Sequence, residues 1–243
     1  MKRRSGLPGG RHSVVEVRRM RRRRPSSTRW LSRQLNDPYV AEARRLGYRS
    51  RAAFKLIELD ERFRLLRPGQ RIVDLGCAPG GWTQVAIARV GRYGIVVGID
   101  IAETAPIPGA TLLSADVRDA ATPAALRAPL GGRADTVLSD MAPSTTGHAA
   151  TDHLRIVALA EDALAVASQI LKPGGSFVVK VFQGGAEGAL LATLKRDFTE
   201  LRHAKPPASR AESAETYVVA TGFRGGRQEP ASAASFSREY PGV

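Results

Sequence analysis

Short apolar runs rich in β-branched residues alternate with helical patterns along the middle of this chain, and this alternation constrains its fold more than any other feature. The five runs span residues 71–75, 94–100, 111–116, 135–140 and 176–182. Continuous apolar runs of this length are typical of strands that are buried on both faces of a sheet. Because strands that alternate with helices pair through right-handed crossovers, the sequence predicts a mostly parallel α/β sheet with helices on both faces.

Apolar spacing and capping residues mark the expected helices. Before the first strand, Asp37 is a good N-cap for a helix from Pro38 to Leu46, and we expect Ser50 to cap the next helix. The clearest helix lies between the last two strands and is closed by the sequence at 172–175. Its apolar stripe consists of Leu154, Val157, Ala160, Leu164, Ala167 and Leu171.

The positive charge of the chain is concentrated at its N-terminal end. The formal net charge is +14, and residues 1–35 contain twelve Lys or Arg and one acid, Glu16. This segment has too few apolar residues to fold alone, so we expect an arm that is disordered until it binds a polyanion. RNA is the favoured partner. A solvated tail and an organellar transit peptide are the alternatives.

We expect one catalytic domain over 36–223 and a flexible tail over 224–243.

Composition excludes several classes of protein. No run of 18 apolar residues and no apolar segment of a secretory signal is present, so a cytoplasmic protein without a membrane partner is expected, with a mitochondrial location as the alternative. The single cysteine and four histidines show no zinc-ligand spacing, so no metal site is expected.

Charged residues end or interrupt the otherwise apolar strands. They are Asp74, Asp100, Asp116, Asp140 and Lys180. A single such residue is most often a helix cap or a satisfied loop residue. Five on successive strands indicate a ligand crevice, because ligands of open α/β sheets bind at the carboxyl ends of the strands.

A glycine-rich turn follows the first strand in the sequence DLGCAPGGWTQ at 74–84. Glycine lets the backbone pass close to a ligand, and Asp100, twenty residues after Gly80, is placed to accept hydrogen bonds from ribose hydroxyls. The turn is not the NAD fingerprint, since Ala78 stands where glycine is required, and no Gly-Lys-Ser/Thr of a P-loop follows. An adenosine-containing cofactor is therefore expected.

Five segments, at 48–56, 74–84, 140–143, 179–182 and 205–217, resemble the S-adenosylmethionine-dependent ribose 2′-O-methyltransferases of the FtsJ/RrmJ type. The resemblance runs from about residue 27 to residue 222. It implies a Rossmann-like class I methyltransferase fold and S-adenosylmethionine as the cofactor. It also implies a substrate in large-subunit rRNA, a uridine of the peptidyl-transferase A-loop. Since the 2′-hydroxyl exists only in RNA, DNA is not an expected substrate.

The resemblance also implies which residues act. The family's catalytic tetrad falls on Lys55, Asp140, Lys180 and Glu215, with Lys180 as the proton acceptor. Its cofactor contacts fall on Gly80, Trp82, Asp100, Asp116 and Asp140. Ordinary surface ion pairs are the alternative interpretation of each tetrad residue, and they explain the set of four poorly.

Cys77 and Trp82 both lie in the segment of the glycine-rich turn. Cys77 has no evident base beside it, so packing is expected rather than nucleophilic catalysis. Trp82 is expected to shape the cofactor pocket rather than to stack on an RNA base.

The enzyme is expected to be a monomer. The alternatives to rRNA methylation are tRNA ribose methylation and a non-catalytic role in ribosome assembly.

Overall fold

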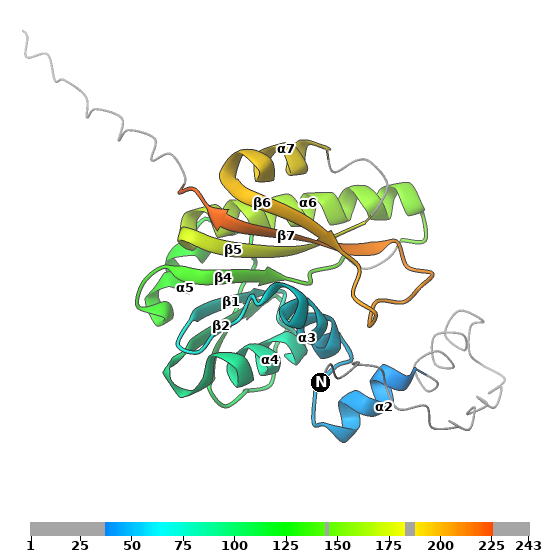
Figure 1. The fold of residues 1–243 in the computed structure, drawn as a ribbon, viewed down its shortest axis with the longest axis horizontal. Coiled ribbons are helices and arrows are strands. Elements are labelled where there is room, and N and C mark those ends of the chain that lie inside the picture. Colours follow the sequence, from blue (N-terminus) through cyan, green and yellow to red (C-terminus); the bar gives the residue numbers. More distant parts are fainter. Residues whose placement is uncertain (1–36, 144–145, 183–187, 226–243) are drawn as a thin grey trace, which may run out of the picture.

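The computed structural model describes residues 37–143, 146–182 and 188–225, which form one seven-stranded sheet covered by helices on both faces (Figure 1). The strands are β1 Arg71–Leu75, β2 Ile95–Asp100, β3 Ala110–Ser114, β4 Ala134–Ser139, β5 Leu171–Phe182, β6 Phe198–Ala204 and β7 Glu215–Phe223. The helices are α2 Pro38–Arg45, α3 Ala52–Phe63, α4 Gly81–Val90, α5 Thr122–Leu130, α6 Ala149–Ile170 and α7 Gly188–Asp197, with a 3₁₀ turn at Gly91–Tyr93.

The strands lie in the order β3-β2-β1-β4-β5-β7-β6. The pairs among β1 to β5 are parallel, whereas β7 is antiparallel to both of its neighbours. This mostly parallel, helix-covered sheet confirms the predicted fold class. Because β2 and β4 flank β1, the chain leaves β1 toward one side and later returns on the other. Such a switch point opens a crevice at the carboxyl ends of these strands.

Two apolar layers hold the helices to the sheet. On one face, α3 and α4 pack on side chains that include Ile72, Leu138 and Tyr217. On the other face, α5, α6 and α7 pack on a layer that includes Val73 and Phe177. Full burial of a leucine-sized side chain stabilises the fold by about 2 kcal/mol, so both layers contribute substantially. The alternation of Ile72 and Val73 between the layers follows from the two-residue period of a strand.

The beginning of α3 departs from the prediction. Asp37 caps α2 as expected, accepting a hydrogen bond from the Tyr39 amide at 3.1 Å. The prediction that Ser50 caps α3 is wrong, because the helix begins at Ala52 after Arg51 and its N-cap makes no side-chain hydrogen bond. The Ser50 side chain is instead directed at Gly81, where an added Cβ atom would lie 2.4 Å from Ser50 Oγ.

The second half of the sheet also differs from the sequence expectation. Strand β5 begins at Leu171, opposite Ala134, and regular pairing resumes only at Ser176, opposite Thr136. The segment at 172–175 that was expected to close the preceding helix therefore bulges from the strand. Strands β6 and β7 were not predicted, and they extend the sheet as an antiparallel hairpin.

The predicted arm at 1–35 and the predicted tail beyond Gly225 lie outside the described residues, so both stay predictions. Within the described ranges, none of the helices is long and apolar enough to cross a membrane.

Candidate active site

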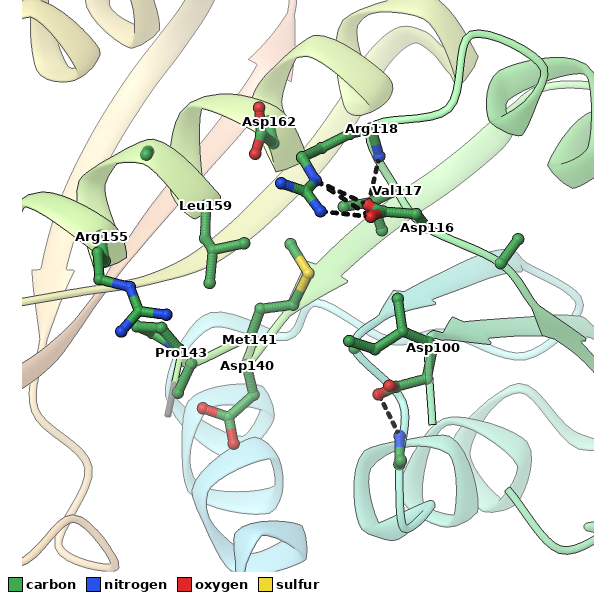
Figure 2. Close-up of a pocket in the computed structure, with 16 residues that line it drawn as sticks. Asp100, Asp116, Val117, Arg118, Asp140, Met141, Pro143, Arg155, Leu159 and Asp162 are labelled. Carbon is green, nitrogen blue, oxygen red and sulfur yellow. Dashed lines mark hydrogen bonds and ion pairs between the residues drawn. The ribbon is translucent and has the colours of Figure 1, made fainter. Parts of the chain in front are cut away.

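A cavity of about 640 Å³ opens at the carboxyl ends of β1, β2 and β4, and we call it the main cavity. Figure 2 shows Asp100, Asp116 and Asp140 arranged around Met141, with Leu159 and Asp162 of α6 forming the opposite wall. Three of the strand-end aspartates singled out in the sequence thus line one cavity. Asp74 does not line it, because this side chain is buried beneath the glycine-rich turn.

Gly76 gives the main cavity its backbone floor. Its φ angle is +76°, a conformation that favours glycine, and an added Cβ atom would lie 2.3 Å from Met141 Cγ. Any larger residue would therefore collide with the Met141 side chain in the segment that follows β4. The absence of a side chain leaves the backbone next to the space where a ligand would lie.

Asp100 organises the glycine-rich turn from the end of β2. Its Oδ2 atom accepts a hydrogen bond from the Ala78 amide at 2.9 Å, and its Oδ1 atom accepts one from the Ala102 amide at 2.8 Å. A carboxylate has about four acceptor positions, so two remain for the hydroxyls of a ligand. The same side chain can therefore shape the turn and bind a ribose.

Arg49 connects the turn to the loop that follows β2. Its Nη1 atom donates to the carbonyls of Pro79 at 3.2 Å and Ala105 at 2.6 Å, and its Nη2 atom donates to the Pro106 carbonyl at 2.7 Å. Gly80 makes room for this contact, because an added Cβ atom would lie 3.2 Å from Arg49 Cδ. This role of Arg49 was not predicted, since nothing local in the sequence indicates contacts so distant along the chain.

Asp116 lies at the far end of the main cavity and is held by Arg118. The Arg118 guanidinium contacts both carboxylate oxygens, and its Nε atom lies 3.0 Å from Asp116 Oδ1 (Figure 2). The hydrogen bonds from the Arg118 side chain and backbone lower the pKa of Asp116 to about 2. Asp116 therefore presents an ionised acceptor toward the cavity.

The four predicted tetrad residues come together from four elements: Lys55 from α3, Asp140 from the end of β4, Lys180 from β5 and Glu215 from the start of β7. Lys180 Nζ lies 3.0 Å from Asp140 Oδ1 and donates to the Asp140 carbonyl at 2.6 Å. Lys55 Nζ lies 2.7 Å from Glu215 Oε1 and 3.7 Å from Asp140 Oδ2. The structure thus places two lysines and two carboxylates in one connected network.

Tyr217 completes this network, although no role was predicted for it from the sequence. Its hydroxyl donates to Asp140 Oδ1 at 2.7 Å and lies 3.3 Å from Glu215 Oε1. The available signal was its spacing, because residues two apart on a strand, such as Glu215 and Tyr217, point to the same face. Burial raises the pKa of Tyr217 well above its ordinary value, and the charges of Asp140 and Glu215 add to this effect. The hydroxyl therefore stays a hydrogen-bond donor.

Asp140 is ionised despite its burial. Burial alone would raise the pKa of this carboxyl group, but the charges of Lys180 and Lys55 and the hydrogen bond from Tyr217 outweigh it and lower the pKa. A buried carboxylate surrounded by donors is held in one orientation. Asp140 therefore acts as the fixed centre around which the two lysines are placed.

The remaining predicted residues lie beside the main cavity rather than in its wall. Gly80 is the N-cap of α4, and the indole of Trp82 is buried. The Trp82 Nε1 atom donates to the Ala52 carbonyl at 2.8 Å, and the ring packs on Tyr217 at a centroid distance of 5.7 Å. The Trp82 side chain thus packs against Tyr217, which in turn holds Asp140 of the tetrad, and the cofactor-binding role of both Gly80 and Trp82 stays a prediction.

Cys77 is unsuited to nucleophilic catalysis. The side chain is buried, and burial raises the pKa of its thiol to about 12, with the charge of Asp74 adding to the effect. Since the thiolate is the nucleophile, a thiol with this pKa is inert near neutral pH.

A second cavity of about 430 Å³ lies on the other side of the tetrad, and we call it the arginine cavity. It is lined by Arg51, Ala52, Lys55, Arg210, Glu212, Ser213 and Glu215. Asp140 lines the main cavity, whereas Lys55 and Glu215 line the arginine cavity. The tetrad therefore borders both cavities, and Lys180, which is buried and lines neither, contacts Asp140.

A family model, a solved structure and curated relatives that are similar to this chain are all described as methyltransferases. Residues 48–223 match the family model described as FtsJ-like methyltransferase. A solved structure from Plasmodium falciparum, described as a ribosomal RNA methyltransferase, superposes with a TM-score of 0.67 and 32% sequence identity. The match covers 74% of this chain and 100% of that chain.

Two curated relatives are closer in sequence. A protein of Paramagnetospirillum magneticum is 63% identical over 91% of this chain and 93% of its own length. A protein of Xanthobacter autotrophicus is 59% identical over 90% of this chain and 87% of its own length. Both are named Ribosomal RNA large subunit methyltransferase E.

Proposed function

The chain belongs to the FtsJ-like methyltransferase family, and we propose that it transfers the methyl group of S-adenosylmethionine to the 2′-hydroxyl of a ribose in large-subunit rRNA. The observation that carries this proposal is the position of the tetrad between the main cavity and the arginine cavity. A methyl donor in one cavity and a nucleotide in the other would meet at these residues. The names of the relatives support a substrate in large-subunit rRNA.

The residues of the main cavity fit S-adenosylmethionine. This cofactor carries a ribose diol, an amino group and a positively charged sulfonium, and four carboxylates line the cavity, those of Asp100, Asp116, Asp140 and Asp162. Asp100 has acceptor positions left for the diol, and Asp116 presents an acceptor for the exocyclic amine of adenine. Gly76 leaves space along the backbone of the turn. When bound, the cofactor supplies an activated methyl group attached to a good leaving group.

We assign to Lys180 the role of accepting the proton of the ribose hydroxyl. The step requires the neutral form of Lys180, so the ammonium that pairs with Asp140 must first lose a proton. The neutral amine has two hydrogens and one lone pair, and both hydrogens have acceptors here, on the Asp140 carboxylate and on the Asp140 carbonyl. The lone pair is then left for the hydroxyl. As the O–H bond breaks, the proton goes to Lys180 Nζ and the oxygen gains nucleophilic character.

The other tetrad residues position the reacting groups. Asp140 holds Lys180 through two contacts and is itself held by Tyr217. Glu215 holds Lys55 and accepts a second hydrogen bond from Ser209 Oγ at 2.9 Å. Lys55 is therefore fixed at the border of the arginine cavity, where its ammonium can orient the ribose oxygen. Alignment of this kind supplies a large part of the rate of an in-line displacement.

The specific target that the family resemblance implies is a uridine of the peptidyl-transferase A-loop, and we propose it as the methylated nucleotide. A ribosomal substrate agrees with the cytoplasmic location expected from the sequence. The test is incubation of the full chain with labelled S-adenosylmethionine and undermethylated large ribosomal subunits, free rRNA, tRNA or DNA, followed by mapping of the labelled nucleotide.

We expect label in large-subunit rRNA, on a ribose, and none in DNA, which lacks the 2′-hydroxyl. Label on tRNA alone would favour the tRNA alternative. Binding to ribosomal subunits without transfer to any RNA would instead favour a non-catalytic assembly factor and would reject the proposed chemistry.

A further inference from the structure

The arginine cavity contains two guanidinium groups that share one carboxylate. Arg51 Nη1 lies 2.7 Å from Asp37 Oδ2, and Arg210 Nη2 lies 3.3 Å from the same oxygen. The other oxygen of Asp37 is engaged at the N-terminus of α2. A single carboxylate oxygen therefore faces two positive charges, which are only partly neutralised by it.

Arg210 has donors left for a ligand. Among the residues that the structure describes, its guanidinium makes one hydrogen bond, the 3.3 Å contact with Asp37, although the group has five N–H donors. The Arg210 side chain is 30% exposed, whereas that of Arg51 is 16% exposed. Arg210 can therefore reach a ligand that enters from solvent.

Arg51 is held more firmly and gives the cavity its shape. It donates to the Ala208 carbonyl and its guanidinium carbon lies 5.5 Å from the centre of the Tyr39 ring. These contacts fix the cation before any ligand arrives, and a preorganised group loses little entropy on binding. The pair thus consists of one rigid and one accessible guanidinium.

The chemistry of the pair favours a phosphate. Guanidinium groups bind phosphate through two parallel N–H bonds, and a cavity of about 430 Å³ lies within the size range of small-ligand sites. In RNA the 3′-phosphate is bonded to the oxygen on C3′, the carbon next to the one that carries the 2′-hydroxyl. A ribose whose hydroxyl reaches the tetrad must therefore bring a phosphate close to it.

We propose that the arginine cavity takes the target ribonucleotide and that Arg210, together with Arg51, binds the phosphodiester adjoining the methylated ribose. This inference rests on the proposed function and identifies a substrate-positioning site for it. Glu212 also lines the cavity and is exposed, so it lies at the solvent side of the site. The competing interpretation is a structural ion-pair network that joins α2, α3 and the loop after β6.

The test compares Arg210→Ala, Arg210→Lys and a matched control, Arg202→Ala. Arg202 is an exposed arginine on β6 that is paired with Glu200 at 2.6 Å, and it lines neither cavity. For each variant, KM and kcat are measured with undermethylated large ribosomal subunits over a salt series. The affinity for S-adenosylmethionine is measured by calorimetry and reports whether the main cavity is intact.

We expect Arg210→Ala to raise KM for the subunits by about ten- to a hundredfold, with kcat and cofactor affinity within a few-fold of wild type. The log–log salt slope should fall by about 0.7–0.9, the value for one lost phosphate contact. Arg210→Lys should keep the slope, because the charge remains, but should raise KM because the planar fork is lost. Arg202→Ala should match wild type.

An Arg210→Ala enzyme with the KM and salt slope of wild type would overturn the phosphate site, as would an equal effect of Arg202→Ala. A lowered melting temperature at unchanged KM would assign Arg210 to the structural network instead. If the wild-type chain transfers no methyl group to any RNA, the proposed function itself fails, and this result is obtained before any variant is made.

Discussion

Asp74 gives the sharpest test of the electrostatics of this fold, and we predict that Asp74→Asn stabilises the protein above neutral pH. The side chain is buried beneath the glycine-rich turn, where Thr83 Oγ1 donates to Asp74 Oδ2 at 2.6 Å. Burial raises the pKa of Asp74 to about 7 against the effect of this hydrogen bond, and the charges of Asp140 and Asp100 add to the rise. The folded chain therefore favours the neutral carboxyl group.

The direction of the pH effect follows from proton binding. An unfolded Asp74 ionises near pH 3.8 and the folded one near pH 7, so the unfolded chain binds fewer protons between these values. Stability must then fall as the pH rises through this window, and the full loss is reached above the folded pKa. The pKa difference corresponds to about 4 kcal/mol of the free energy of unfolding. Asparagine carries no charge and escapes this loss.

The assay is urea unfolding at constant ionic strength between pH 4.5 and 8. We expect Asp74→Asn to be more stable than wild type at pH 8, by up to about 4 kcal/mol, and the difference to shrink toward pH 4.5. The control is Asp116→Asn, because the pKa of Asp116, about 2, lies below the whole window. Its effect should not vary with pH in this range. If Asp74→Asn is less stable than wild type by the same amount at every pH, Asp74 is ionised and satisfied, and the reasoning is refuted.

Three further predictions test the site and the arm. Lys180→Ala should lower turnover by about 10²–10⁴-fold and leave cofactor affinity within a few-fold, and a variant that keeps a tenth of wild-type turnover would show that Lys180 is not the base. Asp100→Ala should abolish measurable binding of S-adenosylmethionine in calorimetry, because two amide donors and the ligand hydroxyls lose their acceptor; near-normal affinity in a folded variant would contradict the assignment. Deletion of residues 1–29 removes eleven positive side chains and one acid and should weaken RNA binding at low salt. In filter binding, the slope of log affinity against log salt should fall by the value for about three phosphate contacts, each contributing about 0.7–0.9. Equal slopes for the truncated and full-length chains would exclude an RNA-binding arm.

The parts of the site that could be predicted from the sequence are those marked by short segments of the chain. The glycine-rich turn and the aspartates at strand ends could be located because a parallel sheet brings the carboxyl ends of its strands to one edge. Asp100, Asp116 and Asp140 line one cavity for this reason. The meeting of the four tetrad residues was implied by the family resemblance and could not be worked out from spacing, since they come from four separate elements.

The parts that could not be predicted depend on contacts between distant segments. Arg49 reaches carbonyls 30 to 57 residues away, and Tyr217 reaches Asp140 across 77 positions. The strand period could place Tyr217 on the same face as Glu215, but it could not show either set of distant contacts. The antiparallel placement of β7 between β5 and β6 likewise depends on tertiary packing. Ser50 was wrongly predicted to be a helix cap because capping preference is a local rule, whereas its side chain packs against the beginning of α4.

The position of β7 has a consequence for the order in which the protein acquires its properties during synthesis. The chain emerges from its N-terminal end, so Asp100, Asp116, Asp140 and Lys180 are made well before Glu215 and Tyr217. Until the last strand is inserted, β5 has an unpaired edge, and Asp140 lacks the hydroxyl that holds it. The residues of the main cavity are thus complete in the nascent chain before the tetrad network, and under the proposed function methyl transfer becomes possible only when the final strand of the sheet is in place.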